Sequence, residues 1–452
     1  MSANNTPQKQ DLAIVILAAG KGTRMKSSVP KVMHKVAGLP IINWLINRVE
    51  KLEPQKIIVV TAPAMDDVIE ASHPYDCVIQ KEQKGTGDAV KPAMEQLKDF
   101  EGKVLVLLGD EPFLDLGLLE EMVGHDGPCV MAIEPESNKG LGRMATDRNQ
   151  NLLRIVEEKD CNDEELEITL SNAGNFCFPA SSLRSWLEKL SNDNAQGEYY
   201  LTDIPEIALE DGVKTKVFTA HTSIVWGINT RSELAAHEEF AQFFLREKAM
   251  EEGVTLVDPN SVTLAWDTEL GEDVIIEPNV IIAEGVTIES GAVIHGFSYL
   301  EGCHIAESAS VGPYARIRPG SHVGEKASVG NFIEVNRSII ESGAKAKHVS
   351  YIGDAVIGSG TNIGAGTIIA NYDGFFKHKS KIGENVFVGS NSTIISPVEI
   401  GDKAIVAAGS NVNKDVPGNA MAIGRSRQEN HLGWASEYRA LKREQKKLAE
   451  DD

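Results

Sequence analysis

The chain of 452 residues is poor in aromatic residues, in cysteine and in positive charge. Aromatic residues make up 6%, and the five cysteines are Cys77, Cys129, Cys161, Cys177 and Cys303. Because these cysteines are odd in number, widely spaced and outside any CxxC or Cys/His pattern, they indicate a reducing, cytoplasmic location rather than a disulfide framework or zinc site. The formal net charge of −22 argues against nucleic acid and anionic membranes as partners.

Long hydrophobic runs are also missing. The apolar run nearest the start, 12–19, is too short to span a bilayer and leads directly into GKGTRMK. We expect it to be a buried strand, preceded by a loose polar leader over residues 1–10. The length of the chain predicts two or three domains.

The back half carries an aliphatic residue at every sixth position. The three series are Leu270, Ile276, Ile282, Ile288, Ile294 and Leu300; Val311, Ile317, Val323, Val329 and Val335; and Ile382, Val388, Ile394, Ile400, Val406 and Val412. Neither a helix nor an ordinary strand keeps this period, which is typical of a β-helix whose short strands point an aliphatic side chain inward. The two interruptions, near 340–350 and 370–381, are the places where we expect chemistry.

The front half alternates short β-rich runs with helical patterns. We expect strands at 13–17, 56–60, 76–79, 103–107 and 129–133, and helices at 41–52 and 87–97. This order predicts an α/β domain with a mainly parallel sheet, which binds ligands at the carboxyl ends of its strands. The expected domains are 1–229, a helical linker 230–251 and a repeat domain 252–452, with hexads to about residue 424. The tail 434–452 is either a charged helix or disordered.

The first strand ends in LAAGKGTRM, residues 17–25. Val15 stands where a P-loop needs glycine, and Met25 stands where a dinucleotide fingerprint needs its third glycine. A glycine-rich strand-to-helix turn remains, with Arg24 and Lys31 as cations, and such a turn can bind an anion through its backbone amides.

These motifs resemble a known family. LAAGKGTRM and PKVMH, followed in order by VIQKEQKGTGDA, LLGDEP, GLGRM, RIVEEKD, SNAG, NAQGEYYLTD and WGINTR, are similar to the bacterial bifunctional N-acetylglucosamine-1-phosphate uridyltransferases / glucosamine-1-phosphate acetyltransferases. The resemblance implies a Rossmann-like nucleotidyltransferase domain, a left-handed β-helix of hexapeptide repeats and a homotrimer. It also implies acetyl transfer from acetyl-CoA to glucosamine-1-phosphate, then uridyl transfer from UTP, giving UDP-N-acetylglucosamine.

The resemblance assigns residues to the uridyl-transfer site. Gln80, Gly85 and Thr86 match positions that recognise uracil, and Gly142, Glu157 and Asn172 match positions that contact the sugar. Asp110 and Asn229 match the pair that holds Mg²⁺, for which a carboxylate, an amide and phosphate oxygens are suitable ligands. Arg24 and Lys31 would neutralise charge during catalysis, and the remaining nucleotide-binding positions are Leu17, Ala18, Ala19, Gly20, Leu108 and Gly109.

The acetyl-transfer residues come from YARIRPG, HVSY and NIGAGTIIANYDG. His348 matches the general base, a role that needs a group titrating near neutral pH. Arg318, Tyr351 and Asn362 match sugar-phosphate contacts, with Asn336 and Lys377 in the same acceptor site. The acetyl-CoA positions are Ala365, Asn371, Tyr372, Ser390, Ala408 and Arg425.

Two residues depart from the family pattern. Glu111 follows Asp110 where the family has a small neutral residue, and it either points away or adds negative charge near the metal. Asn336 replaces a phosphate-binding lysine, so we expect a raised Michaelis constant for glucosamine-1-phosphate unless Arg318 and Lys377 compensate. The adjacent Arg337 would face the other side of the strand unless the corner is remodelled. The rival interpretation is a one-activity nucleotidyltransferase with a scaffolding coil, as in the similar glucose-1-phosphate adenylyltransferases.

Overall fold

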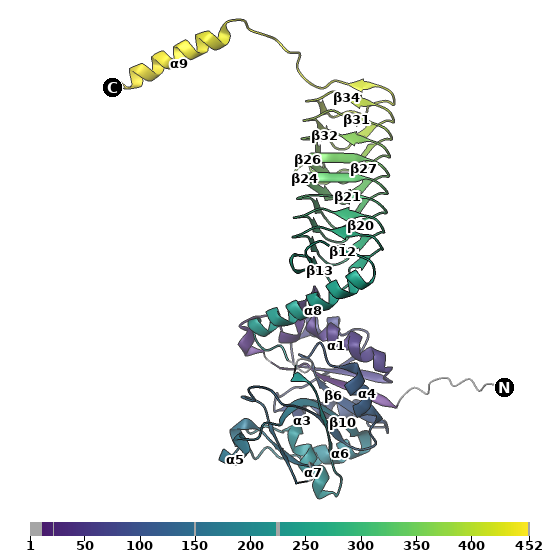
Figure 1. Ribbon diagram of the computed structural model, residues 1–452, viewed down its shortest axis with the longest axis vertical. Helices are drawn as coiled ribbons and strands as arrows, with labels where there is room; N and C mark the ends of the chain where they lie inside the picture. Colours follow the sequence, from purple (N-terminus) through teal and green to yellow (C-terminus); the bar gives the residue numbers. More distant parts are fainter. Residues whose placement is uncertain (1–10, 21, 149–150, 223–226, 451–452) are drawn as a thin grey trace, which may run out of the picture. The chain divides into compact units, whose positions relative to one another are not determined.

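The computed structural model describes residues 11–20, 22–148, 151–222 and 227–450. The chain divides into two compact units, Met1–Leu245 and Arg246–Asp452 (Figure 1). The predicted leader 1–10, Lys21 of the glycine-rich turn and Trp226 of WGINTR lie outside the described residues.

The first unit is built on a mixed sheet with strand order β11-β7-β10-β6-β1-β4-β5. Strands β1, β4, β5 and β6 are mutually parallel, as are β7 and β11, and β10 runs antiparallel between them. The five predicted strands are confirmed. The bounds are β1 Leu12–Leu17, β4 Lys56–Thr61, β5 Asp76–Ile79, β6 Lys103–Leu108, β7 Cys129–Ile133, β10 Ser171–Pro179 and β11 Lys216–Thr219.

Shorter elements complete this unit. Strands β8 (Arg143–Thr146) and β9 (Leu152–Val156) pair with each other, and β8 pairs with β10. The helices are α1 Ile41–Val49, α2 Asp66–Ala71, α3 Thr86–Gln96, α4 Leu116–Gly124, α5 Asp163–Leu166, α6 Ala180–Lys189 and α7 Ile204–Glu210. Both predicted helices are present as α1, extended by a 3-10 turn over Glu50–Leu52, and α3.

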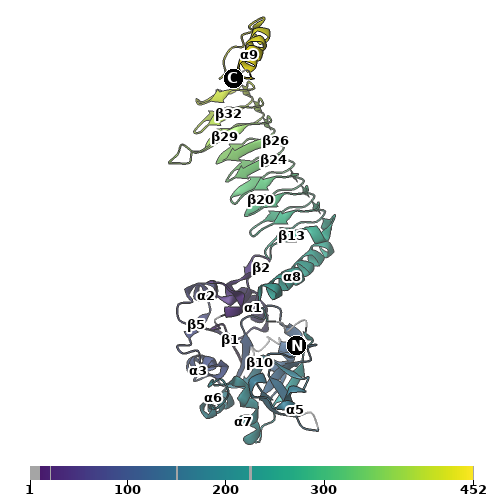
Figure 2. The same ribbon diagram turned by 90° about the vertical axis from the view of Figure 1, so that its left-hand side faces the viewer.

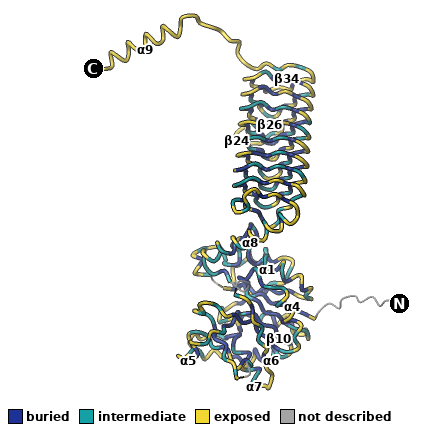
Figure 3. The backbone as a smooth tube through the Cα atoms, in the orientation of Figure 1, coloured by how far each residue is buried: buried dark blue, intermediate teal, exposed yellow. Residues whose placement is uncertain are grey.

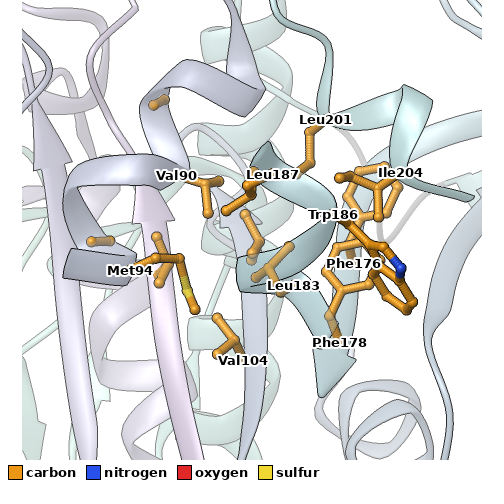
Figure 4. Packing of buried hydrophobic residues seen from close by; sticks show 14 of the residues in the cluster. Val90, Met94, Val104, Phe176, Phe178, Leu183, Trp186, Leu187, Leu201 and Ile204 are labelled. Atoms are coloured by element: carbon orange, nitrogen blue, oxygen red, sulfur yellow. The ribbon is translucent and has the colours of Figure 1, made fainter. Parts of the chain in front are cut away.

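The sheet buries both faces. In β1, Ala13 and Val15 belong to one apolar cluster, whereas Leu12, Ile14 and Ile16 belong to another. This alternation follows from the two-residue period of a strand, and it requires helices on both sides of the sheet. In the first cluster, Phe178 stacks on Phe176 at 5.5 Å between ring centroids and meets the edge of Trp186 (Figure 4).

The long helix α8, Arg231–Glu251, confirms the predicted helix at 230–251 and contains the division between the two units. Helix α9, Trp434–Glu450, answers the open question about the tail in favour of a helix. No helix in the described ranges is long and apolar enough to cross a membrane.

The second unit is a β-helix whose coils are formed by very short strands (Figure 1). Two of its faces form one hydrogen-bonded sheet of β12 Thr255–Leu256, β13 Thr263–Leu264, β15 Ile275–Ile276, β16 Ile281–Ile282, β18 Val293–Ile294, β19 Tyr299–Leu300, β21 Ser310–Val311, β22 Arg316–Ile317, β24 Ser328–Asn336, β26 Lys345–Gly353, β28 Asn362–Ile363, β29 Ile368–Ala370, β31 Phe387–Val388, β32 Thr393–Ile395, β34 Ile405–Val406, β35 Asn411–Val412 and β36 Met421–Ala422. The third face contains β14 Glu269–Leu270, β17 Thr287–Ile288, β20 Cys303–Ile305, β23 Ser321–Val323, β25 Ile339–Ile340, β27 Ala355–Ile357, β30 Ser380–Ile382 and β33 Glu399–Ile400.

The hexad residues point inward, as predicted. From Ile276 to Val412 the predicted aliphatics are buried, and Figure 3 shows the dark buried positions alternating with exposed ones along the coils. Successive coils pair in parallel, so that Ile275 lies beside Val293, 18 residues further on. This register brings residues about 18 positions apart into contact, on the outside of the coil as well as inside.

One prediction about the coil was wrong. The stretch 340–350 does not interrupt it, because Ile340, Ala346 and Ile352 continue the buried row. The turn between Val335 and Ile340 is one residue shorter, which reduces the pairing step there to 17, as between Asn331 and His348. The turns between Leu300 and Ile305 and between Ile352 and Ile357 are shortened in the same way. The second predicted interruption is real. The step rises to 25 between Asn362 and Phe387, because a loop over residues 371–379 projects from the coil beside β29 (Figure 2).

Replacing Phe178 by alanine should destabilise the first unit by about 3–5 kcal/mol, because the ring is fully buried and the neighbouring rings cannot close the cavity completely. Pulse proteolysis across a urea series, which reports fragments of each unit separately, measures the change. Leu153→Ala is the control, since Leu153 is 38% exposed and its loss should cost less than about 0.5 kcal/mol. Equal effects of the two substitutions would contradict this account of the core.

Candidate active sites

A cavity of about 510 Å³ opens in the first unit at the carboxyl ends of β1 and β6. This is where a parallel sheet is expected to bind its ligand. Ten predicted residues line it: Leu17, Ala18, Ala19, Gly20, Lys31, Gln80, Gly85, Thr86, Leu108 and Asp110. Val32, Gln83, Ala89 and Glu198 also line the cavity, so residues from five separate parts of the chain meet there.

The glycine-rich turn differs from the prediction in one respect. It leads into a 3-10 turn, Thr23–Met25, and not into an α-helix, so little helix dipole acts on a bound anion. Gly22 has a φ of +57°, and a Cβ there would lie 2.7 Å from the Cβ of Lys31. Glycine at this position therefore lets Lys31 approach the turn, and the side-chain cation takes the place of the helix terminus.

Asp110, Asn229, Lys31 and Arg24 form one cluster. The Nζ of Lys31 donates to Oδ2 of Asp110 and, at 3.1 Å, to Oδ1 of Asn229. The guanidinium of Arg24 donates to the same Asn229 oxygen at 2.8 Å. The amide of Ile228 donates to the carbonyl of Asp110 at 3.0 Å, which holds the two chain segments together. Both predicted metal ligands thus direct an oxygen at the ammonium group of Lys31, and carboxylate and amide oxygens of this kind also fit Mg²⁺.

The residues predicted to recognise uracil are also held by hydrogen bonds. Gln80 donates through Nε2 to the carbonyl of Gly85 at 3.1 Å and to Asp88 at 2.8 Å. Gly85 has a φ of +105°, and a Cβ there would lie 2.5 Å from the carbonyl oxygen of Tyr199, so only glycine fits. Thr86 accepts a hydrogen bond from the amide of Leu201 at 3.0 Å.

The three sugar positions lie together, outside the cavity lining. The main-chain N–H of Asn172 donates to the carbonyl of Gly142 at 2.8 Å. A Cβ on Gly142 would lie 3.5 Å from Oε1 of Glu157, which accepts from Thr202 at 3.0 Å. Burial raises the pKa of the Glu157 carboxyl above its ordinary value. Gly109 follows the cavity residue Leu108, and its amide donates to the carbonyl of Leu17 at 3.0 Å.

Glu111 is 4% exposed and accepts a hydrogen bond from Nδ2 of Asn175 at 2.6 Å. Burial, reinforced by the neighbouring Asp110, raises its pKa well above the ordinary value. The carboxyl is therefore bonded within the core, and its raised pKa disfavours a second negative charge beside Asp110.

In the coil, His348 hydrogen-bonds through Nδ1 to Oδ1 of Asn331 at 2.9 Å. An amide oxygen only accepts, so Nδ1 carries the proton in the neutral ring and Nε2 keeps a lone pair. Asn331 lies beside His348 in the β24–β26 pairing. Both side chains are accessible from outside the coil, which allows His348 to meet a substrate.

A second polar group lies at the next corner of the same coils. Arg337 forms two hydrogen bonds of 2.8 Å to Asp354, and Nδ2 of Asn371 donates to the same carboxylate at 2.5 Å. Asn336 lies 3.4 Å from the hydroxyl of Tyr351. Among the other predicted acceptor residues, Arg318 donates to Glu334 at 2.8 Å. The backbone of Lys377 forms an isolated antiparallel β-bridge with that of Tyr372, and Asn362 lies opposite Lys345 in the β26–β28 strand pairing.

Four of the predicted acetyl-CoA positions lie on successive coils: Ala365, Ser390, Ala408 and Arg425. The carbonyl of Ala365 accepts from the amide of Asn391, next to Ser390, at 2.7 Å. The carbonyl of Ser390 accepts from the amide of Gly409, next to Ala408, at 2.8 Å. A Cβ on Gly409 would lie 3.9 Å from Cδ of Arg425. These four residues therefore form a continuous row along the coil.

The projecting loop is held together from within. The carboxylate of Asp373 accepts from the amides of Phe375 and Phe376 at 2.8 and 2.6 Å, and it pairs with His378 at 2.7 Å. These bonds, above all that to His378, lower the pKa of Asp373 to about 2. The loop begins at Asn371 and Tyr372, and the ring of Phe375 at its tip is 87% exposed.

Several residues at these sites escaped the sequence reasoning. Gln83 donates to the carbonyl of Ala19, and Glu198 lines the same cavity, but both come from loops without a periodic signal. Asn331 could have been found, because it precedes His348 by one coil step. Asp354 follows Arg337 by the same 17 residues.

Fold and sites together define a nucleotidyltransferase domain joined to a hexapeptide-repeat transferase. Residues 14–201 match the MobA-like NTP transferase domain. Residues 267–302 match the bacterial transferase hexapeptide, and residues 380–414 match the hexapeptide repeat of succinyl-transferase.

Curated relatives cover almost the whole chain. Proteins named "Bifunctional protein GlmU" from Zymomonas mobilis, Sphingopyxis alaskensis and Clostridium novyi are 44%, 45% and 39% identical over 95%, 96% and 93% of this chain and 98% of their own. The chain belongs to this bifunctional GlmU family. It is an enzyme of UDP-N-acetylglucosamine synthesis with an N-terminal nucleotidyltransferase domain and a C-terminal left-handed β-helix that serves acetyl transfer.

Replacing Glu111 by glutamine should remove a pH-dependent loss of stability. The unfolded chain ionises Glu111 above its ordinary pKa of 4.5, whereas the folded chain keeps the proton to higher pH, so the wild type loses stability as pH rises above about 4.5. The introduced amide retains an oxygen that can accept from Asn175. We expect the variant's advantage in denaturation midpoint to grow from pH 4 to pH 7. An advantage that stays constant with pH would contradict a buried, protonated carboxyl.

Proposed function

We propose that the cavity of the first unit binds UTP and N-acetylglucosamine-1-phosphate and transfers the uridyl group between them. The observation that carries this proposal is the convergence of Asp110 and Asn229 on Lys31 at the cavity. Gln80, Gly85 and Thr86 would hold the uracil, next to Leu17, Ala18, Ala19, Gly20, Leu108 and Gly109. Gly142, Glu157 and Asn172 would hold the sugar.

Asp110 and Asn229 would hold Mg²⁺, which when bound neutralises phosphate charge and orients the triphosphate. Lys31 and Arg24 then place positive charge around the same phosphates. The sugar phosphate attacks the α-phosphorus in line and pyrophosphate leaves, so no covalent enzyme intermediate is needed. Catalysis rests on positioning and charge neutralisation.

For acetyl transfer, we propose that His348 takes a proton from the glucosamine ammonium through Nε2. The amine then attacks the acetyl thioester, and coenzyme A leaves as the thiol. Asn331 holds the ring by its Nδ1–H and keeps Nε2 as the base. Arg318, Asn336, Tyr351, Asn362 and Lys377 would bind the acceptor. Ala365, Asn371, Tyr372, Ser390, Ala408 and Arg425 would bind acetyl-CoA.

We also propose that the enzyme is a cytoplasmic homotrimer whose acetyl-transfer site needs more than one chain. The separation of two polar groups on the coils that contain β24 and β26 supports this proposal. Both long strands bend at a left-handed residue, Phe332 and Val349, which separates His348 from the group around Asp354. No hydrogen bond of the described residues joins these two groups. A neighbouring copy, with its projecting loop, can bring them together. The proposed domains are 1–229, the linker 230–251 and 252–452.

The substitution Asp110→Asn should abolish uridyl transfer and leave acetyl transfer intact. Loss of a carboxylate ligand removes several kcal/mol of charge stabilisation, which corresponds to at least about a hundredfold in rate. Pyrophosphate release from UTP, N-acetylglucosamine-1-phosphate and Mg²⁺ measures the first activity, and free thiol from acetyl-CoA measures the second. Asp99→Asn, at an exposed position, is the control. Loss of both activities from a folded protein would contradict two separate sites.

The substitution His348→Ala should lower acetyl transfer by roughly 10²- to 10⁴-fold and leave uridyl transfer unchanged, because only the general base is lost. Asn331→Ala should give a smaller loss, since the base remains but is no longer held. His295→Ala is the control, because this coil histidine is bonded to Glu277 at 2.9 Å, far along the stack. Undiminished thiol release by His348→Ala would refute His348 as the general base, whereas absence of thiol release from the wild type would favour the one-activity interpretation, in which the coil is a scaffold.

A further inference from the structure

Left-handed residues recur at the corners of the coil, and one corner carries a row that changes from glycine to charged residues. Gly285, Gly302 and Gly320 occupy it in three coils, with φ between +51° and +75°. The next two coils have Arg337 and Asp354 there, with φ of +48° and +49°. The left-handed conformation costs a residue with a side chain roughly 1–2 kcal/mol, whereas glycine adopts it readily.

The left-handed backbone determines where the side chain of Arg337 lies. In an extended strand it would point to the opposite side from Asn336, but here its Nη1 donates to Oδ1 of Asn336 at 3.1 Å. The Nε and Nη2 groups each donate to Asp354 at 2.8 Å. The corner is thus remodelled, and a guanidinium lies beside the amide that replaces the family's lysine.

The guanidinium has donors left for a ligand. Of its five N–H groups, one on each nitrogen accounts for the three bonds to Asp354 and Asn336, so one remains on Nη1 and one on Nη2. The carboxylate of Asp354 is satisfied by Arg337 and by Asn371, and Lys377 lies close enough to lower its pKa further. The side chain of Arg337 is 39% exposed, so its unused donors can reach a solute.

We propose that Arg337 is a phosphate-binding residue of the acetyl-transfer site, in place of the lysine that Asn336 replaces. The inference rests on the proposed acetyl transfer to glucosamine-1-phosphate. Asp354 anchors the guanidinium through Nε and Nη2, and the remaining N–H groups of Nη1 and Nη2 bind the phosphate oxygens together with the amide of Asn336. A planar guanidinium suits two phosphate oxygens at once. The missing lysine therefore does not leave the site one cation short.

The test is a cycle of Arg337→Gly, Asn336→Lys and the double variant. Glycine is suitable because it occupies the same corner in three coils and relieves the strain at Arg337. Arg337→Gly should raise the KM for glucosamine-1-phosphate roughly ten- to a hundredfold, the effect of one charge-assisted hydrogen bond, with KM for acetyl-CoA unchanged. Asn336→Lys alone adds a second cation beside the same phosphate and should lower the KM for glucosamine-1-phosphate. In the double variant it should restore most of the loss.

The rescue separates binding from structure. If Arg337 only fastened Asp354 to its neighbouring coil, a lysine at 336 would not restore the KM, and this result would overturn the proposal, as would an unchanged KM in Arg337→Gly. Lys326→Ala is the matched control, since Lys326 is a cation at a left-handed position of a different corner and pairs with Glu325 at 2.5 Å. Failure of the wild type to acetylate glucosamine-1-phosphate would refute the proposed function itself, a distinct outcome.

Discussion

The structure of the second unit depends on one constraint: each coil must return to the same three faces so that its strands pair with those of the coil before. The aliphatic residues meet this constraint from inside, because burying one at each face fixes the phase of the chain. The neighbours of each outward-facing side chain are then set by the same register. A pairing step of 17 places Asn331 beside His348 and Arg337 beside Asp354. Polar partners far from the core are thus positioned by the core's register.

In the first unit, the direction of the parallel strands brings the site residues together. Its parallel strands have their carboxyl ends on one edge of the sheet, so the segments after β1 and β6 meet whatever their separation in sequence. Asn229 comes from much later in the chain, and the main-chain bond from Ile228 to Asp110 brings it to the same edge. Here rigid strands fix the position of loops, whereas in the coil the strands themselves carry the chemistry.

The sequence predicted those features that repeat or that end a strand. Six-residue spacing revealed the coil, and the family resemblance assigned Leu17, Leu108 and Asp110, which lie at or just after the ends of buried strands. It could not predict the unbroken coil at 340–350, since one turn shortens there by a residue without changing the inward row. Nor could residue types reveal the direction of Arg337, which depends on a backbone angle of +48°.

Charge explains why these local arrangements matter in so acidic a chain. With a net charge of −22 the protein does not attract phosphates at long range, and salt screens charges beyond about 8 Å. Each cation must therefore be held where the phosphate will lie. Lys31 has three donors, of which Asp110 and Asn229 take two, and Arg337 keeps two of its five. Both cations can thus bind a phosphate oxygen without first leaving the groups that position them.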